Sequence, residues 1–273
     1  MPNELFYENQ LRASADRFVT DSLLHWDGLV SPKFPLIFCG IQGKCEREGS
    51  DPSFFNISEI EKVLYYIKTL VQEKKAAPSE IGVITPYRKH AAKIQKAMSI
   101  LKGNYEEVLV GTCEKLQGQE RKVIIITTVR SSTEYLESDQ HFDIGFVKHP
   151  KRFNVAITRA KALLITIGNP HILSKDPNWN KLLRFCKVNN AYEGCEFEFD
   201  HDDDVEACGE QNQMTTEIGS PGAFGRIRNR LKTIFNTEAN SSFQMEDDDN
   251  DDSYDDDDND DAMVMNSDDD YND

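Results

Sequence analysis

Short apolar runs recur along the first 200 or so residues and alternate with segments in which apolar residues repeat at helical spacing. The runs are rich in Val and Ile, and several are bounded by Gly or Pro. They predict five strands, at residues 36–39, 81–85, 108–111, 123–129 and 162–167. Strands that are apolar along their whole length are typical of a parallel sheet with helices on both faces. The pattern therefore predicts an α/β fold with a mostly parallel sheet.

Helices are predicted between these strands. The first begins at Ser58, which forms a capping box with Glu61, and its apolar residues repeat at helical spacing: Ile60, Val63, Leu64, Ile67 and Val71. Three more are predicted at 89–101, 152–158 and 179–188, and the first of these has a basic outer face. The segment TCEKLQGQERK between two strands is predicted to be a polar loop. This alternation predicts one α/β domain over residues 1–200.

The pattern changes beyond residue 200. Residues 201–245 are polar with little periodicity, and they predict a linker. Within it, FGRIRNRLKTIF at 224–235 has apolar residues on one face and cations on the others, which predicts a short basic amphipathic helix. Residues 246–273 contain sixteen Asp and Glu and no Lys or Arg. Like-charge repulsion and the scarcity of apolar residues predict a disordered acidic tail there.

The formal net charge of −17 comes almost entirely from that tail. The preceding 245 residues contain 32 acidic and 31 basic side chains, so their net charge is −1. The part predicted to fold is therefore nearly neutral, and the acidity of the chain does not exclude a nucleic-acid ligand.

Cysteine usage and the N-terminus bear on the compartment. The six cysteines form no CxxC pair and no His-assisted zinc spacing, which predicts reduced thiols and no metal site. The N-terminal segment MPNELFYENQ lacks the cationic and apolar regions of a signal peptide, and the apolar runs are too short to span a bilayer. We therefore expect a soluble, cytoplasmic protein without a membrane partner.

The segment GIQGKC at 40–45 faintly resembles a phosphate-binding loop. The Walker A pattern requires Gly where Phe38 stands and Ser or Thr where Cys45 stands, so it fails at two positions. No other segment supplies the pattern, and no GxGxxG follows a predicted strand. The sequence therefore predicts that this chain has no triphosphate-binding loop of its own.

Polar residues follow the predicted strand 81–85 in the segment TPYRK. Because the carboxyl ends of parallel strands form the ligand edge of such a sheet, we expect Thr85, Tyr87 and Arg88 at that edge. Tyr suits stacking on a base or ribose, and Arg suits a phosphate. An ordinary capped strand with a polar turn explains the same residues equally well, so both interpretations stay open.

A second polar segment, GTCEKLQGQE, connects strands 108–111 and 123–129. Gly118 is the residue type needed where a backbone turns tightly or approaches a ligand closely. The hydroxyl of Thr112 suits a phosphate oxygen, and the carboxylate of Glu120 suits a pair of ribose hydroxyls. The alternative is a glycine turn between strands with a solvated Glu120.

Three cations, Arg152, Arg159 and Lys161, precede the apolar run 162–167 in RFNVAITRAK. The predicted helix 152–158 leads directly into Arg159, which would hold this guanidinium on a rigid element at an edge of the sheet. A planar donor fork that is always charged suits phosphate. Lys161 is interpreted as a solvated surface charge. Arg152 fits either a solvated surface charge or a phosphate-binding cation.

Taken in this order, the three segments resemble motifs IV, V and VI in the second RecA-like domain of superfamily 1 helicases of the nonsense-mediated-decay type. The flanking segments SFFN and DPNWNKLLRFCK are most similar to the Moloney-leukaemia-virus-ten-like, or Armitage-type, RNA helicases, and the acidic tail favours a germline-type member. The resemblance covers roughly residues 1–199. It implies a RecA-like, three-layer domain.

The resemblance also implies a mechanism, in which ATP binds between two RecA-like domains and RNA lies across both. Arg159 would be the catalytic arginine finger at the γ-phosphate, and Glu120 would contact the ATP ribose. Arg152 would assist at the ATP site. The residues implied along the RNA path are Thr85, Pro86, Tyr87 and Thr112.

The chain departs from that family because the Walker A loop and magnesium-binding motif of the first RecA-like domain are missing. The resemblance therefore implies a C-terminal fragment or short isoform without ATPase activity of its own. ATP and Mg²⁺ would bind only in the full-length parent. The implied partners are RNA, the first RecA-like domain, and Piwi- or Argonaute-type proteins of small-RNA silencing, including the Piwi-interacting RNA pathway.

Two other interpretations compete with a helicase. A short isoform or fragment of this kind would be a non-catalytic adaptor that binds RNA or protein, with helix 224–235 and the acidic tail as docking segments. An unrelated α/β nucleotide-binding enzyme is the third interpretation, and the missing glycine fingerprint argues against it.

Overall fold

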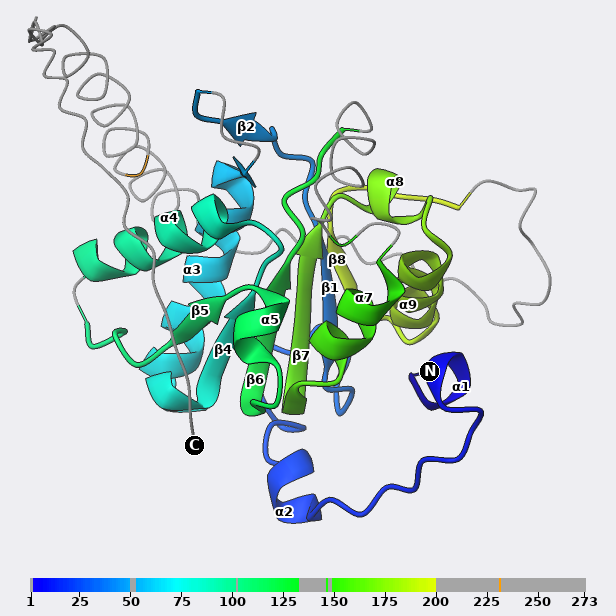
Figure 1. Ribbon diagram of the computed structural model, residues 1–273. Helices are drawn as coiled ribbons and strands as arrows, with labels where there is room; N and C mark the ends of the chain where they lie inside the picture. The colour runs from blue at the N-terminus through cyan, green and yellow to red at the C-terminus, as the bar shows by residue number, and fades with distance from the viewer. Residues whose placement is uncertain are drawn as a thin grey trace, which may run out of the picture. The chain divides into compact units, whose positions relative to one another are not determined.

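The computed structural model describes residues 2–49, 53–101, 103–132, 146, 149–199 and 231. Its strands are β1 Leu36–Gly40, β2 Glu46–Arg47, β3 Phe54–Phe55, β4 Ile81–Ile84, β5 Leu109–Gly111, β6 Arg121–Thr127, β7 Ala160–Gly168 and β8 Tyr192–Gly194. Its helices are α1 Pro2–Phe6, α2 Arg17–Thr20, α3 Ile57–Gln72, α4 Arg88–Ile100, α5 Cys113–Leu116, α7 Pro150–Ile157, α8 Pro170–Leu173 and α9 Pro177–Val188, with a 3-10 turn at Pro78–Glu80. Figure 1 shows these elements with their labels.

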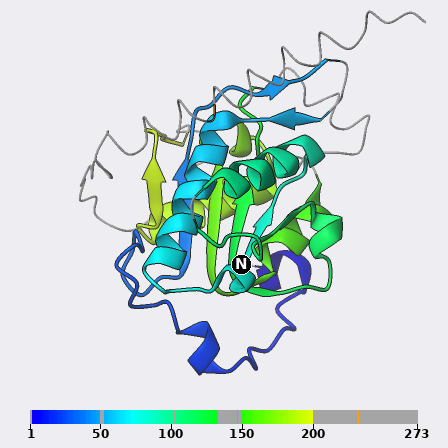
Figure 2. The same ribbon diagram turned by 90° about the vertical axis from the view of Figure 1, so that its left-hand side faces the viewer.

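Six strands form one sheet in the order β5-β4-β6-β7-β1-β8, and every pairing in it is parallel. Helices α3 and α4 lie on one face, in front of the sheet in Figure 2, and α5, α7 and α9 lie on the other. The predicted α/β fold with a parallel sheet between two layers of helices is therefore confirmed.

The central strands are buried on both faces. On β6, Ile124 and Ile126 pack into a core cluster with Phe153 of α7 and Trp179 of α9. The next residue, Thr127, points to the opposite face, where its hydroxyl contacts side chains of α3 and α4. Side chains of a strand alternate between the faces of a sheet, so a strand covered on both faces is apolar at nearly every position.

Several elements differ from the predictions. Helix α3 begins one residue earlier than expected, because the Asn56 side chain accepts hydrogen bonds from the amides of Ser58 and Glu59 and is the N-cap. The loop predicted at 112–122 contains helix α5. Strand β8 and the antiparallel pair β2–β3 were not predicted, because runs of two or three residues carry no readable period.

The expected basic outer face of helix 89–101 is only partly correct. Lys93 of α4 is 5% exposed, and its ammonium lies 2.5 Å from Glu48 and 4.3 Å from the ring centroid of Phe55. Lys89 pairs with the same carboxylate at 3.1 Å. Two of the cations on this helix therefore hold the segment around β2 and β3.

The predicted linker and acidic tail, residues 201–273, lie outside the described residues apart from Leu231. That residue is helical and 3% exposed, within the helix predicted at 224–235. Across the described parts of the chain, no helix combines the length and apolar character needed to cross a bilayer.

Candidate functional site

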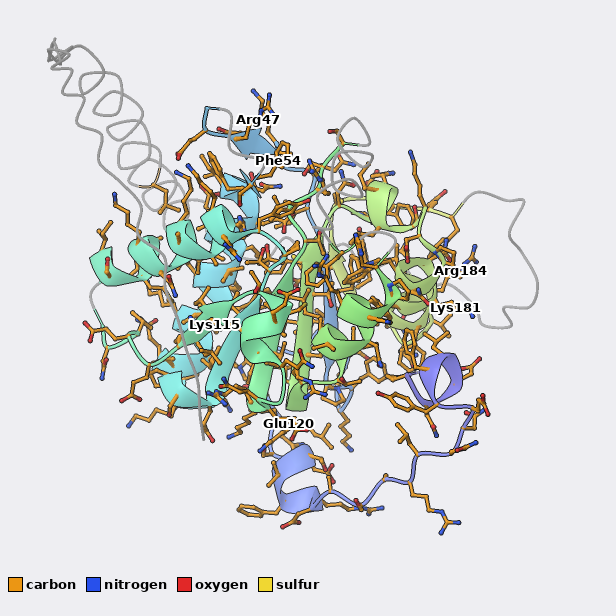
Figure 3. The ribbon with its side chains drawn as sticks, in the orientation of Figure 1. Arg47, Phe54, Lys115, Glu120, Lys181 and Arg184 are labelled. Carbon is orange, nitrogen blue, oxygen red and sulfur yellow. The ribbon has the colours of Figure 1, made fainter. Side chains whose placement is uncertain are left out.

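The three motif segments reach opposite ends of the parallel sheet. Thr85 follows β4 and Thr112 follows β5, so both lie at the end where the strands finish, here called the carboxyl end. Glu120 precedes β6 and Arg159 precedes β7, so both lie at the other, amino end. Figure 3 shows Glu120 at the end of the sheet opposite Phe54.

At the amino end, one backbone hydrogen bond joins the second and third motif segments. The amide of Arg121 donates to the carbonyl of Arg159 at 3.1 Å, because β6 and β7 are neighbours in the sheet. The side chains of Glu120 and Arg159 therefore belong to adjacent strand starts, although the two residues are far apart in sequence. Glu120 is exposed and Arg159 is half-buried.

The guanidinium of Arg159 is oriented by the end of α7. Its Nε donates to the carbonyl of Val155 at 3.1 Å, and one terminal nitrogen donates to the hydroxyl of Thr158 at 3.0 Å. These bonds engage two of its donor groups and restrict the rotamers of the side chain. The remaining N–H groups suit an anionic ligand, since guanidinium carries five donors in a fixed fork.

The loop before β6 is shaped by Gly118 and held by Arg121. Gly118 has φ +75°, and no other atom lies within 4 Å of the position its Cβ would occupy, so the backbone there is open. The guanidinium of Arg121 donates to the Glu120 carbonyl at 3.0 Å and to the Gln119 side chain at 3.1 Å. Arg121 therefore restrains the backbone that carries Glu120.

Arg152 lies on α7 and is engaged with α5. Its Nε is 3.0 Å from Glu114 Oε1. Burial acts to raise the pKa of Glu114, but hydrogen bonds from Thr112, its own amide and Arg152 outweigh burial and lower that pKa. Arg152 and Thr112 are thus connected through one carboxylate, on the helical face between the two ends of the sheet.

At the carboxyl end, the amide of Thr85 donates to the Gly111 carbonyl at 3.0 Å, which ties the ends of β4 and β5 together. Thr112 and Pro86 are half-buried there. Thr85 is fully buried, and its hydroxyl has no hydrogen-bond partner among the described residues. The polar residues of the first two motif segments are therefore close together at this end.

Contrary to expectation, the side chain of Tyr87 does not lie at the surface. Its ring is 1% exposed and meets the ring of Phe54 edge-on, with centroids 5.9 Å apart. The Arg130 guanidinium, itself buried, lies 3.9 Å from the Phe54 centroid and 5.3 Å from that of Tyr87. In this structure the ring stabilises the turn after β4 by packing, so it is not available to stack on a base.

A buried polar network beneath the carboxyl end was missed by sequence reasoning. Glu59 of α3 and His90 of α4 are both fully buried, and Thr127 of β6 lies between them. The Thr127 hydroxyl donates to Glu59 at 2.5 Å and lies 3.0 Å from His90 Nε2, while His90 Nδ1 accepts from the Asn56 amide at 3.2 Å. Burial raises the pKa of Glu59 to about 7 and lowers that of His90 to about 3, so a neutral imidazole is favoured.

This network holds a strained turn after β6. Val129 has φ +71°, which is unfavourable for a β-branched residue. Its amide donates to Glu59 at 2.9 Å, and its carbonyl accepts from the Asn56 side chain at 3.2 Å. The turn directs the following residue, Arg130, onto the ring of Phe54. The only sequence signal was a Glu three residues after an Asn, which is typical of a helix start.

The amino end can be compared with the requirements of a nucleotide. An oriented guanidinium fits phosphate oxygens, and an exposed carboxylate fits a pair of ribose hydroxyls, so the donor set matches those parts of ATP. Within the described ranges, no three His, Cys, Asp or Glu side chains are grouped so that they could hold an ion.

Comparison with known proteins gives a consistent set of relatives. The family model for the AAA domain matches residues 1–171. The putative helicase mov-10-B.1 of Danio rerio is 49% identical over 205 residues, which are 71% of this chain and 20% of that relative. The RNA helicase Mov10l1 of Homo sapiens is 47% identical over 200 residues, 72% of this chain and 16% of that relative. The probable RNA helicase armi of Drosophila melanogaster is 43% identical over 161 residues, 58% and 13% respectively. The chain therefore spans about a fifth or less of the length of these relatives.

Proposed function

We propose, because the chain belongs to the AAA domain family, that it acts as one RecA-like half of an ATP-dependent RNA helicase. Its amino end would face ATP and its carboxyl end would face RNA. The observation that carries the proposal is the hydrogen bond between the Arg121 amide and the Arg159 carbonyl. This bond makes neighbours of the two residues, Glu120 and Arg159, whose chemistry suits ribose and phosphate.

On the nucleotide side, Arg159 would donate hydrogen bonds to the terminal phosphate and offset the negative charge that develops there in phosphoryl transfer. Its orientation by Val155 and Thr158 supports this role, because a pre-oriented donor costs little reorganisation during the reaction. Glu120 would accept hydrogen bonds from the ribose hydroxyls. Bound ATP would supply the phosphoryl group, and Mg²⁺ would be held outside this chain.

On the RNA side, the half-buried Pro86 and Thr112 would contact the sugar–phosphate backbone at the carboxyl end of β4 and β5, and the fully buried Thr85 would support the turn beneath them. Their closeness supports the proposal, because hydroxyl and backbone groups at one edge suit phosphate contacts that position a strand without reading its sequence. Arg152 would act indirectly, through Glu114, on the helices between the two ends. We further propose, as the resemblance of the motif segments implies, that the parent protein acts in small-RNA silencing in the cytoplasm, including the Piwi-interacting RNA pathway, with Piwi- or Argonaute-type partners.

The proposal is tested with a chimera in which this chain replaces the matching segment of the Danio rerio relative. We expect ATP hydrolysis that is stimulated by single-stranded RNA. Arg159→Ala should lower kcat about 10³-fold to 10⁵-fold while the Kd for RNA stays unchanged. The matched control is Lys161→Ala, which removes an exposed cation two residues away and should leave kcat within about twofold. An inactive chimera, or equal losses in the two variants, would contradict the proposal.

A further inference from the structure

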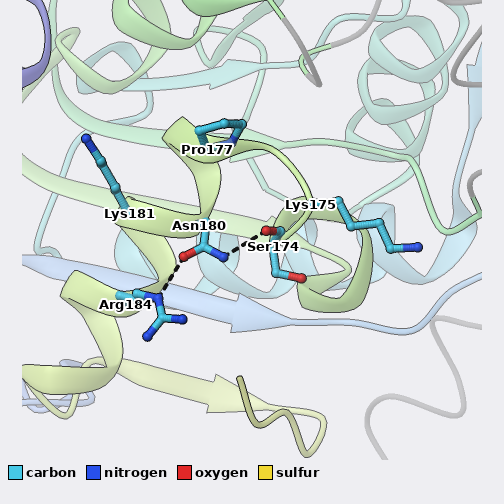
Figure 4. Close-up of a pocket in the computed structure, with 6 residues that line it drawn as sticks. All are labelled: Ser174, Lys175, Pro177, Asn180, Lys181 and Arg184. Carbon is cyan, nitrogen blue, oxygen red and sulfur yellow. Dashed lines mark hydrogen bonds between the residues drawn. The ribbon is translucent and has the colours of Figure 1, made fainter. Parts of the chain in front are cut away.

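A basic pocket lies at the junction of α8 and α9, and none of the residues that line it belongs to the three motif segments. Its volume is about 430 Å³, and Figure 4 shows the residues that line it: Ser174, Lys175, Pro177, Asn180, Lys181 and Arg184. Three of these six side chains are cations, and no Asp or Glu of the described chain is among them. The pocket lining is therefore positively charged and also includes a hydroxyl and an amide group.

The floor of this pocket is internally braced. Arg184 Nε donates to the side-chain oxygen of Asn180 at 2.8 Å, and the Asn180 amide donates to the Ser174 carbonyl at 2.8 Å. The guanidinium carbon of Arg184 also lies 4.0 Å from the ring centroid of Phe199. These contacts fix the direction of the guanidinium, so an anion that enters the pocket meets a donor group already in place.

The two lysines at the rim are exposed, and within the described chain neither makes a hydrogen bond or ion pair through its ammonium group. Asp176, which follows Lys175 in sequence, is not among the residues that line the pocket. Asp176 is 4% exposed, and its carboxylate accepts from the amides of Asn178 and Trp179 as the N-cap of α9. Within the described part of the chain, the charge of Lys175 and Lys181 is therefore not neutralised by an acidic side chain.

The pocket continues the carboxyl end of the sheet. Helix α8 begins directly after β7, and its N-cap Asn169 donates to the Ser131 carbonyl at 3.3 Å, beside the turn that follows β6. Along this end the strands run β5, β4, β6, β7. Three strand spacings of roughly 4.8 Å separate the β5 end from the β7 end, or about 14 Å. A strand of nucleic acid at Pro86 and Thr112 would therefore lie about 14 Å from the end of β7, from which α8 leads to the pocket.

We propose that this pocket binds backbone phosphates of single-stranded RNA and extends the RNA path across β6 and β7 to α9. The inference rests on the proposed function, since it lengthens the same nucleic-acid surface. RNA is favoured over an acidic protein because the pocket follows β7 and α8 at the carboxyl end of the sheet, where the RNA surface is proposed, and its lining includes one guanidinium and two ammonium groups. Its lining lacks aromatic rings, so it holds phosphate and does not stack or read bases.

The test measures binding of the full 273-residue chain to a fluorescein-labelled 20-nucleotide oligouridylate by anisotropy, between 50 and 200 mM KCl. The test variant is Lys175→Gln with Lys181→Gln. The matched control is Lys68→Gln with Lys74→Gln, two cations of α3 and its C-terminal end, toward the amino end of the sheet. Both variants remove two charges from surface positions.

We expect the pocket variant to weaken binding at 50 mM KCl by about tenfold or more and to reduce the slope of log K against log [salt] by about 1.4, since each phosphate contact on a single strand contributes roughly 0.7. The control should change the slope by less than half as much. If the unaltered chain binds RNA and both variants have equal effects, the pocket is not an RNA-binding site. The proposed function is unaffected by that result.

Two further results separate the remaining cases. Failure of the unaltered chain to bind the oligonucleotide would overturn the inference, and ATP hydrolysis by the chimera with its Arg159→Ala variant would then judge the proposed function separately. A labelled decaglutamate peptide is the second probe. If binding of this peptide depends on Lys175 and Lys181 while binding of the oligouridylate does not, the pocket is a site for acidic protein and the inference is wrong.

Discussion

The amide of Arg121 donates a hydrogen bond to the carbonyl of Arg159 across 3.1 Å, and this contact joins two segments between which the described chain contains β6 and α7. Glu120 and Arg159 become neighbours at the amino end of the sheet as a result. Thr85 and Thr112 are gathered at the opposite end by a matching bond from the Thr85 amide to Gly111. The domain thus has two polar ends with different chemistry, and each can be probed separately.

Replacing Arg159 with Lys should show that the shape of the donor matters as well as its charge. A lysine keeps the positive charge but loses the planar fork and the bonds to Val155 and Thr158. In the chimera we expect kcat for ATP hydrolysis to fall by about 10³-fold, with the KM for ATP and the Kd for RNA within about threefold. Activity close to that of the unaltered chimera would show that a point charge is sufficient.

Glu120 should determine the preference for ribose over deoxyribose. If its carboxylate accepts from the ribose hydroxyls, the unaltered chimera should show a KM for ATP about tenfold or more below that for 2′-deoxy-ATP, because a hydrogen bond to a charged group contributes about 1.5–3 kcal/mol. Glu120→Ala should raise the KM for ATP and remove the difference. The adjacent exposed residue supplies a control, and Gln119→Ala should preserve the preference. A preference that survives Glu120→Ala would assign the ribose to another residue.

Tyr87 should contribute to stability and not to RNA affinity. Its ring is buried against Phe54 and Arg130, so Tyr87→Leu should lower the free energy of unfolding by about 1–3 kcal/mol in urea titrations. RNA affinity measured well below the unfolding midpoint should stay within about twofold. Loss of a base stacked on this ring would instead cost about 1–3 kcal/mol of binding, which is a fivefold to 150-fold increase in Kd.

Glu59 should make stability depend on pH in a direction unusual for a carboxylate. Burial raises its pKa to about 7 in the folded chain, above the value of 4.5 expected when the chain is unfolded. The folded state then binds more protons than the unfolded state between these values, so stability contributed by the protonated group is complete below pH 4.5 and is lost as pH rises to about 7. The loss amounts to about 3 kcal/mol, at 1.36 kcal/mol for each pKa unit.

The measurement is the difference in unfolding free energy between the unaltered chain and Glu59→Gln at pH 5 and at pH 8. The comparison with the variant is needed because His90, whose pKa is lowered to about 3, adds an opposite slope between about pH 3 and 6.5. We expect the unaltered chain to be the more stable at pH 5, with the difference shrinking or reversing at pH 8. A difference that is independent of pH would show that Glu59 titrates normally.

Much of the fold was predictable because it depends on local patterns. The apolar runs of β4, β6 and β7 and the helical spacing of α3 and α9 were read directly from residues a few positions apart. The errors have local causes too. The sequence favours Ser58 as the cap because Glu61 follows it three residues later, but Asn56 is better positioned to accept from the amides of Ser58 and Glu59. Strand β8, with three residues, is too short to show a period.

The candidate site was predictable only in part. The residues that share chemistry were identified, because Arg, Glu and Thr in polar segments between buried strands are conspicuous. Their solvent exposure could not be predicted, since it depends on which other segments of the chain pack against them. Tyr87 looked available for stacking, yet Phe54 and Arg130 cover it from two distant segments. Glu59 looked like an ordinary helix residue, yet it is fully buried against Thr127 and Val129.

The sequence by itself determined the α/β class, the order of the motif segments and the residue types in them, because strand and helix periods are set by neighbours along the chain. Only the tertiary structure decided which ends of the sheet those residues share. Strand order is set by the packing of whole strands and helices, and the pairing of β6 with β7 joins Glu120 to Arg159. The same packing separates them from Thr112, eight residues before Glu120, because α5 carries the chain from one end of the sheet to the other.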